Sequence, residues 1–231
     1  MIVTRIERQR RHRNRVNLFL DGEFAFGLHE EIIVKAQIRV GDELDPATIG
    51  IVKSHEETKL ARDNALRLLS HRMRSEKELR FTLLEREFDP TIVNNVVLEL
   101  QTKGYVDDRK FAAAFIRDAR LRKPAGTAML FQKLRLKGID RALIMESLNE
   151  LLPTDTEQEL AYTTAMKLLK RIRTSRKPVP QEKEKQRLTQ YLAQRGFPWN
   201  TIRPVLRKVF ATVVAVNPTE AEVIPTDVEA G

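Results

Sequence analysis

The chain has no cysteine among its 231 residues. Disulfide bonds, thiol catalysis and thiolate metal sites are therefore excluded, and the composition suits a reducing compartment. No run of about 18 apolar residues occurs, and residues 1–15 lack the apolar stretch that a secretory signal needs. From these absences we expect a cytoplasmic protein without a membrane-spanning segment.

Signatures of catalysis and of cofactor binding are also absent. The four histidines, His12, His29, His55 and His71, never stand three or four residues apart, so a histidine metal site is not expected. The sequence has no glycine-rich phosphate loop and no nucleophile elbow. We therefore predict a protein with no cofactor, no metal and no enzymatic activity.

One acidic pair, Asp107 and Asp108, has two interpretations. Adjacent carboxylates bind Mg²⁺ in some enzymes that act on nucleic acids, but the further acidic ligands of two-metal phosphoryl chemistry are missing here. The pair directly precedes an expected helix, where carboxylates cap free N–H groups and face the positive end of the helix dipole. We favour the capping interpretation.

Positive charge is what the chain has in excess. Forty-one Lys and Arg against 32 Asp and Glu give a net charge of +9. The last 21 residues contain four acidic residues and no basic one, so residues 1–210 carry +13. A basic surface favours a polyanionic partner, because binding releases the counterions condensed on phosphates. The alternative is that the charge serves solubility alone.

Three clusters of Lys and Arg are the candidate contacts for nucleic acid or for a nucleoprotein filament. Arginine suits this role because its planar guanidinium donates paired hydrogen bonds to phosphate or carboxylate, whereas the alternative for any one cluster is a solvated helix face. The first cluster comprises Arg5, Arg8, Arg10, Arg11, Arg13 and Arg15. The second comprises Arg117, Arg120, Arg122, Lys123, Lys133, Arg135 and Lys137. The third comprises Lys170, Arg171, Arg173, Arg176 and Lys177.

Only the first part of the chain alternates with the period of a strand. Apolar residues at every second position flank Asp21-Gly22, which indicates a hairpin. We expect a three-residue loop ending in Gly22, which places Leu18 opposite Phe24; a two-residue loop would place Leu18 opposite Ala25. Residues 2–8 are expected to add a third strand, followed by a short helix over about 29–36 and a turn at 41–42.

From Asp45 onward the apolar residues follow the period of a helix, in a three-helix unit that occurs three times. We predict a mainly α protein, in which tandem three-helix, helix-turn-helix-like repeats form an elongated, curved solenoid behind a small N-terminal β-hairpin module. The expected domains are the β module (1–55), repeat 1 (56–105), repeat 2 (106–153), repeat 3 (154–212) and a disordered acidic tail (213–231).

The joint between the second and third helix of each repeat supports this interpretation. Gly138 and Gly196 stand at equivalent turns, where the chain needs a residue that tolerates positive φ before an apolar residue packs into the core. In the first repeat the equivalent residue is Glu87, which departs from the pattern.

Several stretches of the repeats match one known family. They are Ala65-Leu66-x-Leu68-Leu69-x-x-Arg72-x-Arg74-Ser75-Glu76-x-Glu78-Leu79-Arg80, then Gly104-Tyr105-Val106-Asp107-Asp108-x-x-Phe111-Ala112, then Leu134-x-x-Lys137-Gly138-Ile139 and, more weakly, Leu192-x-x-Arg195-Gly196-Phe197. In order and spacing these residues resemble the RecX regulatory proteins. The resemblance implies a modulator of the RecA recombinase that docks in the groove of the filament on single-stranded DNA. It also implies suppression of ATP hydrolysis and strand exchange, and some intrinsic DNA binding.

Three functional hypotheses follow. The leading one is a monomeric regulator of recombination and DNA repair, which binds the RecA filament on single-stranded DNA and also contacts double-stranded DNA. The alternative is a DNA-binding protein that uses its basic helix-turn-helix-like repeats without a recombinase partner. The third, an enzyme acting on nucleic acid, rests on Asp107 and Asp108 alone.

Overall fold

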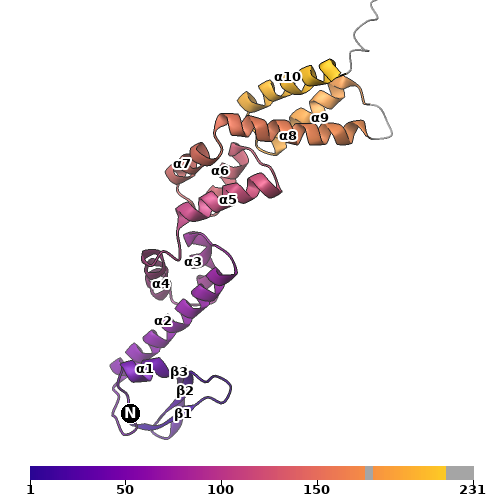
Figure 1. The fold of residues 1–231 in the computed structure, drawn as a ribbon. Helices are drawn as coiled ribbons and strands as arrows, with labels where there is room; N and C mark the ends of the chain where they lie inside the picture. Colours follow the sequence, from indigo (N-terminus) through magenta and orange to yellow (C-terminus); the bar gives the residue numbers. More distant parts are fainter. Residues whose placement is uncertain (175–178, 217–231) are drawn as a thin grey trace, which may run out of the picture. The chain divides into compact units, whose positions relative to one another are not determined.

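The computed structural model describes residues 1–174 and 179–216, with the backbone alone for residues 212–216 (Figure 1). The chain divides into two units, Met1–Asp107 and the part from Asp108 onward. In the described residues, the first unit has a three-stranded sheet and four helices, and the second has six helices. The expected mainly α fold with tandem three-helix repeats and an N-terminal β module is confirmed. Arg176, Lys177 and residues 217–231 of the expected tail lie outside the described residues.

The N-terminal module is an antiparallel sheet with one short helix. Strands β1 (Val3–Arg8), β2 (Arg15–Leu20) and β3 (Glu23–His29) pair in the order β1-β2-β3, and α1 (Glu30–Lys35) follows. Alternate residues of β2 point to opposite faces, and those of the inner face are buried against Ile32 and Ile33 of α1. The third strand and the short helix agree with the expectation from sequence.

The hairpin loop differs from the expected one. β2 and β3 are joined by two residues, Asp21 with φ of 49° and Gly22 with φ of 87°. Two successive residues with positive φ are typical of a type I′ turn, whose twist matches that of the flanking strands. The prediction of a three-residue loop was therefore wrong, because aspartate as well as glycine adopts the left-handed conformation here.

The register within the hairpin was also predicted wrongly. It shifts between Leu18 and Phe19, so that Leu18 lies opposite Phe26 instead of Phe24 or Ala25. The extra residue thus lies inside β3 and not in the loop. Cross-strand partners share a face of the sheet, so Phe26 joins the inner face while Phe24 pairs with Phe19 on the outer face, with ring centroids 5.9 Å apart.

Repeat 1 consists of α2 (Pro46–His71), α3 (Glu76–Leu84) and α4 (Pro90–Thr102). Each helix begins at a side-chain cap, because Asp45, Ser75 and Asp89 accept hydrogen bonds from the first free N–H groups. Helix α2 is continuous across the expected boundary at residues 55 and 56. Its first half contributes Val52 to the core of the β module, and its second half contributes Ala61, Ala65 and Leu68 to the core of the repeat.

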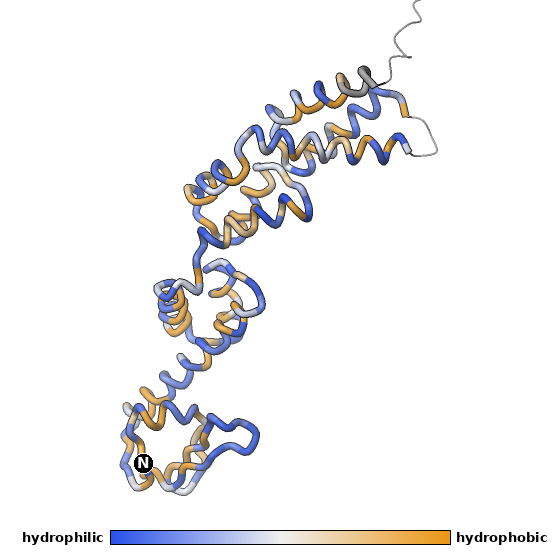
Figure 2. The backbone as a smooth tube through the Cα atoms, in the orientation of Figure 1, coloured by the Kyte–Doolittle hydropathy of each residue, from blue (hydrophilic) through white to orange (hydrophobic). Residues whose placement is uncertain are grey.

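The second unit contains repeats 2 and 3. Repeat 2 consists of α5 (Asp108–Arg122), α6 (Thr127–Leu136) and α7 (Arg141–Leu151), and repeat 3 of α8 (Thr154–Arg173), α9 (Gln181–Gln194) and α10 (Trp199–Val216). Hydrophobic and hydrophilic positions alternate along each of these helices with the helical period (Figure 2). Helix α10 ends at Val216, four residues beyond the expected end of repeat 3 at residue 212.

All three joints between second and third helices have the same backbone conformation. The φ angle is 64° at Glu87, 86° at Gly138 and 77° at Gly196. The next residue packs inward, and Ile139 and Phe197 are buried. Glu87 therefore occupies a left-handed position that costs a non-glycine residue about 1–2 kcal/mol. The expected equivalence of the joints is confirmed, including at the position where glycine is missing.

Candidate nucleic-acid interface

The first basic cluster separates into exposed and internally bound residues. Arg10, Arg11 and Arg13 are exposed in the loop between β1 and β2, which extends beyond the sheet in Figure 1. Among the described residues none of the three guanidinium groups has a carboxylate partner within ion-pair distance. An exposed loop of unpaired cations can bind phosphates without first breaking internal ion pairs.

The other arginines of this cluster are engaged within the module. Arg5 stacks on the ring of Phe19, 3.8 Å from its centroid. Arg8 binds Glu30 at 2.5 Å on the surface. Arg15 is directed inward, where its Nη1 lies 2.8 Å from Oε1 of Glu56. The side chain of Arg15 is only 22% exposed, so its role in this structure is to neutralise a buried carboxylate.

The second cluster lies on repeat 2 and divides in the same way. Arg117 and Lys123 are exposed in and after α5, and Lys133 and Arg135 are exposed on α6. None of these four has a carboxylate partner among the described residues. Lys137, half-buried at the end of α6, has other contacts.

Two arginines at the end of α5 have local partners. Arg120 donates from Nη1 to the carbonyl oxygen of Leu151 at 2.9 Å, which satisfies an otherwise free acceptor at the end of α7. Arg122 pairs with Asp118 at 2.7 Å, one helical turn away. Both residues also lie in the last turn of α5, where positive charge stabilises the helix dipole.

The third cluster lies at the end of α8. Arg173 donates from Nε and Nη2 to the two carboxylate oxygens of Glu184, at 2.9 and 2.7 Å, and so joins α8 to α9. Glu184 is buried whereas the side chain of Arg173 is 39% exposed, so this bidentate pair lies at the edge of the repeat core. Lys170 and Arg171 remain exposed on α8. The structure thus separates outward-facing cations from those that hold the repeats together.

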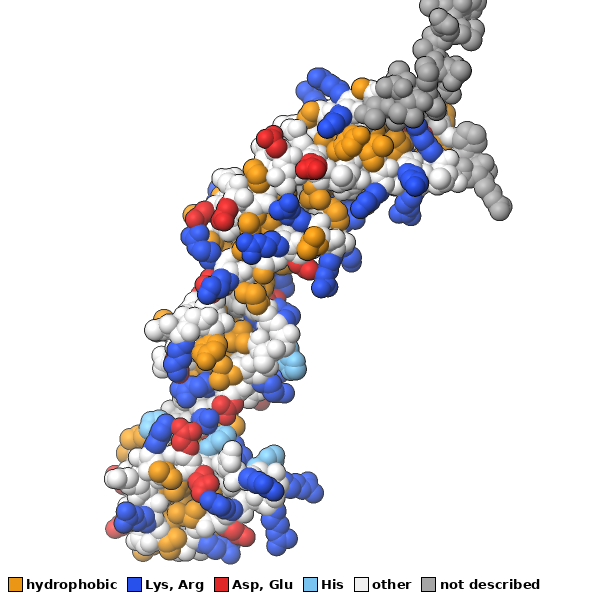
Figure 3. Space-filling model, in the orientation of Figure 1, with side chains coloured by type: hydrophobic (Ala, Val, Ile, Leu, Met, Phe, Trp, Pro, Cys, Tyr) orange, Lys and Arg blue, Asp and Glu red, His pale blue; other side chains and the backbone are white. Residues whose placement is uncertain are grey.

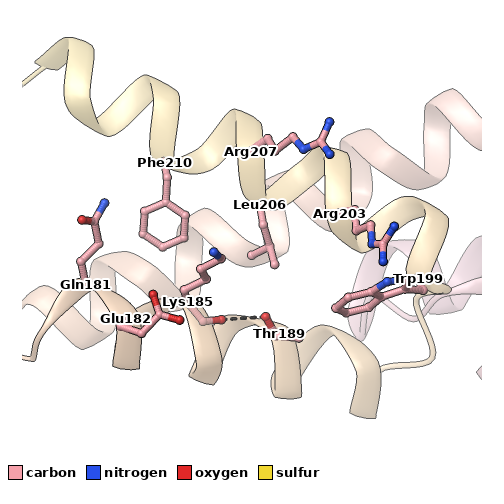
Figure 4. A pocket seen from close by; sticks show the side chains of 9 residues that line it. All are labelled: Gln181, Glu182, Lys185, Thr189, Trp199, Arg203, Leu206, Arg207 and Phe210. Carbon is pink, nitrogen blue, oxygen red and sulfur yellow. Dashed lines mark hydrogen bonds between the residues drawn. The ribbon is translucent and has the colours of Figure 1, made fainter.

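A groove in repeat 3 is a surface feature that the sequence clusters missed. It lies between α9 and α10, has a volume of about 470 Å³ and combines cationic with apolar side chains (Figure 4). Its lining comprises Gln181, Glu182, Lys185, Thr189, Trp199, Arg203, Leu206, Arg207 and Phe210. Arg203 lies over the ring of Trp199, 5.4 Å from its centroid. The sequence signal for this surface is the four-residue spacing of Trp199, Arg203 and Arg207, which places them on one helix face.

The acidic pair Asp107-Asp108 lies at the boundary of the two units, and Asp108 is the first residue of α5. Both side chains are half-buried and make contacts. In the part of the chain that the structure describes, no three His, Asp or Glu residues are grouped so that they could hold a metal ion. That the pair caps α5 stays a prediction.

Carboxylates that accept N–H groups at helix starts have altered acidity. Hydrogen bonds from the backbone N–H groups of Ala142 and Leu143 lower the pKa of Asp140. In the same way, the N–H groups of Ile92 and Thr91 lower the pKa of Asp89. These shifts have a structural cause, the capping of α7 and α4, and they do not mark a reactive site.

Figure 3 shows Lys and Arg side chains on both units, with fewer Asp and Glu side chains among them on the face drawn. The described part of the chain contains no helix that is long and apolar enough to cross a bilayer.

Comparisons with known proteins match the chain from its first residue to repeat 3. The family model described as the regulatory protein RecX N-terminal domain matches residues 1–45. The models of the first, second and third three-helix domains of RecX match residues 61–107, 107–148 and 155–206. The regulatory protein RecX of Bacillus licheniformis is 34% identical over 206 residues, which are 89% of this chain and 76% of that protein. The chain belongs to the RecX family of regulatory proteins.

Other RecX proteins agree with this assignment over most of their length. The regulatory protein RecX of Clostridium beijerinckii is 30% identical over 212 residues, covering 92% of this chain and 97% of that one. A crystal structure of regulatory protein RecX has a TM-score of 0.70 at 27% identity and covers 91% of this chain and 98% of its own. The structure of RecX from Lactobacillus salivarius is similar in fold, with a TM-score of 0.61 and coverage of 68% of this chain and 99% of its own. The resemblance stated from the sequence motifs is thereby confirmed.

Proposed function

We propose that this RecX-family chain binds the RecA recombinase filament on single-stranded DNA and inhibits its ATPase and strand-exchange activities. It would act in the cytoplasm as a monomer and modulate recombination and DNA repair. Membership of a family of regulatory proteins supports a regulatory role. The observation that supports the rest of the proposal is a set of exposed cations, on the β module and on repeat 2, that have no carboxylate partner within the part of the chain that the structure describes.

These cations divide into two surfaces that can be tested separately. The loop surface consists of Arg10, Arg11 and Arg13, and the repeat-2 surface consists of Arg117, Lys133 and Arg135. The phosphates of a nucleic acid or the carboxylates of a protein can contact either surface. If one filament engages both surfaces, the combined binding exceeds the affinity of either surface alone.

The decisive experiment is a titration of the cognate recombinase on single-stranded DNA, with ATP hydrolysis and strand exchange as readouts. We expect the wild-type chain to inhibit both activities. Reversing the loop surface (Arg10, Arg11 and Arg13→Glu) or the repeat-2 surface (Arg117, Lys133 and Arg135→Glu) should raise the half-inhibitory concentration. The matched control reverses three exposed cations elsewhere, Arg39, Lys77 and Arg141→Glu, with the same change in net charge. An unchanged ATPase rate at stoichiometric wild-type protein would refute the proposal.

Direct DNA binding distinguishes this function from that of a DNA-binding protein without a recombinase partner. Each lost phosphate contact lowers the slope of log affinity against log salt by about 0.7 on single strands, so the loop reversal should lower it by about 2 if all three arginines contact phosphate. A sequence preference on duplex DNA, together with no effect on the recombinase, would support the alternative function.

A further inference from the structure

The groove between α9 and α10 is suited to a peptide that is both acidic and apolar. Lys185, Arg203 and Arg207 supply positive charge along its length, and among the described residues Glu182 is the one carboxylate in its lining. Among the described residues, none of the three cations lies within ion-pair distance of a carboxylate. Leu206 and Phe210 supply the apolar floor, and Figure 4 shows their side chains directed toward α9.

Trp199 forms one end of this groove and is 52% exposed. Together with Leu206 and Phe210 it gives the groove a continuous apolar lining, and a contiguous apolar patch bordered by charges is typical of a binding surface. A partner that consisted of charge alone would leave the apolar part of the groove uncovered. The pairing of cations with aromatic and aliphatic surface therefore calls for a ligand that carries both kinds of group.

One segment of the chain itself has this composition. Residues 217–231 contain four carboxylates and no basic residue, and apolar residues lie between the carboxylates. The carboxylates are those of Glu220, Glu222, Asp227 and Glu229, and the apolar residues are Val223, Ile224 and Val228. This segment begins immediately after the last residue of α10, the helix that forms one wall of the groove. We propose that residues 217–231 bind in the groove between α9 and α10.

The length of the segment is sufficient for this contact. Helix α10 rises by about 1.5 Å per residue, so its end lies roughly 9 Å from Phe210 and roughly 26 Å from Trp199 along the axis. An extended chain spans about 3.3 Å per residue, so ten residues cover about 33 Å after a turn of a few residues. The segment therefore reaches the whole groove when it runs back along α10.

The covalent connection makes this contact effective even with modest intrinsic affinity. A short flexible tether gives an effective concentration in the millimolar range. If the segment occupies the groove in about nine molecules of ten, the apparent Kd of any other anionic ligand of the groove rises about tenfold. The segment would thus regulate access to this one basic surface, and the inference does not depend on the proposed action on the recombinase.

The only tryptophan of the chain, Trp199, reports directly on the groove. In the main experiment, acrylamide quenching of its fluorescence is compared between the wild-type chain and a full-length variant with a neutral segment (Glu220, Glu222 and Glu229→Gln, and Asp227→Asn). We expect the quenching constant to rise about twofold in the variant, because a tethered segment at millimolar effective concentration no longer covers the ring. Equal quenching in the two proteins overturns the proposal.

A variant of the groove supplies the second measurement. The double substitution Lys185→Gln and Arg207→Gln leaves Arg203 on the Trp199 ring and should raise the quenching constant as much as the neutral segment does. A chain that carries both the groove and the segment changes should show no further rise, because the two sets of changes remove the same contact. The matched control is Lys183 and Arg187→Gln, which removes two exposed charges of α9 outside the groove lining and should not change quenching. An additive effect of groove and segment changes contradicts the proposal.

Two additions to the solution identify the occupant. A synthetic peptide of residues 217–231 should restore protection of Trp199 in a chain that ends at residue 216, and protection should weaken with salt because the contact is ionic. No protection at peptide concentrations up to about 5 mM, above the effective concentration of a short tether, overturns the proposal. The second addition is an oligothymidylate, whose protection of Trp199 is compared between the wild type and the neutral-segment variant. Equal protection in the two proteins also overturns the proposal, because the groove would then be a nucleic-acid site that the segment does not cover.

Discussion

Each of the two units contains a buried glutamate that joins two parts of that unit. Glu56 on α2 connects repeat 1 to the β module, and Glu157 on α8 connects repeat 3 to repeat 2. They are 6% and 4% exposed. A buried carboxylate is costly unless its oxygens find partners, so both positions require a specific arrangement of neighbours.

The partners of the two carboxylates differ in kind. Glu56 accepts from the guanidinium of Arg15 at 2.8 Å and from the backbone N–H of His29 at 2.7 Å. Glu157 accepts from the backbone N–H of Thr127 at 2.7 Å and from the hydroxyl of Thr201 at 3.1 Å, and both donors are neutral. The first junction is therefore held by a charge pair, whereas the second is held by neutral donors.

Close backbone contact explains why the second junction needs no cation. The N–H of Gly126 donates to the carbonyl oxygen of Arg195 at 2.9 Å, and Ala128 donates to that of Gly196 at 3.2 Å. A Cβ atom at Gly126 would lie 2.3 Å from the carbonyl oxygen of Gly196. Here two glycines bring the backbones of repeats 2 and 3 together, and the carboxylate fills a site that this approach has already formed.

The largest effect should follow from removing the carboxylate of the charged junction. Glu56→Ala leaves Arg15 unpaired, with a side chain that is only 22% exposed, and should cost about 3 kcal/mol. Hydrogen exchange of the amides of β2 and β3 should then accelerate by roughly a hundredfold. The exposed Glu23 of β3 is the control, and Glu23→Ala should leave these rates nearly unchanged.

A similar but slightly smaller loss is expected from blocking the backbone contact of the second junction. Gly126→Ala places a methyl group against the carbonyl of Gly196 and should cost about 2–3 kcal/mol. Urea unfolding monitored by Trp199 emission measures this loss in the second unit. Gly138→Ala is the comparison, because it strains a residue with positive φ and should cost about 1–2 kcal/mol. If Gly126→Ala were harmless, the repeats would not depend on this contact.

The same conservative substitution at both glutamates tests the difference between them. Glu157→Gln keeps an oxygen for the N–H of Thr127 and offers an N–H₂ group to the hydroxyl of Thr201, so the loss should be about 1 kcal/mol. Glu56→Gln removes the charge that Arg15 requires and should cost about 2 kcal/mol or more. Hydrogen exchange measures the loss of stability in each unit. Equal losses for the two substitutions would show that the charge of Glu56 has no separate role.

The smallest effect concerns an exposed carboxylate that also accepts N–H groups. Folding lowers the pKa of Asp140, so its ionised carboxylate stabilises the folded state fully at pH values above the unfolded-state pKa of about 3.9. This stabilisation is lost as the pH falls through the lower folded-state pKa. Asp140→Asn keeps a cap that does not titrate. The difference in Tm between wild type and variant should therefore decline between pH 5 and 2, and a constant difference would contradict this assignment.

Much of the fold could be predicted because local signals agreed with it. Asp45, at which the helical period of the sequence begins, caps the start of α2, and the predicted joints at Gly138 and Gly196 have positive φ. The hairpin register could not be predicted from the sequence. The position of the extra residue in β3 depends on whether Phe24 or Phe26 packs on the inner face of the sheet. That choice depends on α1 and α2, which cover the sheet.

The candidate site was predicted less completely. The density of basic residues in the sequence predicted Arg10, Arg11 and Arg13 as contacts, but it did not distinguish these exposed residues from the internally paired Arg15. The partner of Arg15, Glu56, lies 41 positions away in the sequence. The groove of repeat 3 was missed because its cations are four residues apart on α10 or lie on α9, and no dense run of basic residues marks it.

The sequence by itself determined the periodic helices, their caps, the three equivalent joints and the family, because each depends on residues that are close in the chain. Tertiary structure alone decided which charges are available to a partner. An arginine is paired within the fold or left to solvent according to the carboxylate that folding brings to it, as Glu56 is brought to Arg15 and Glu184 to Arg173. Such pairing is long-range, and the free energy of a buried charge makes it selective.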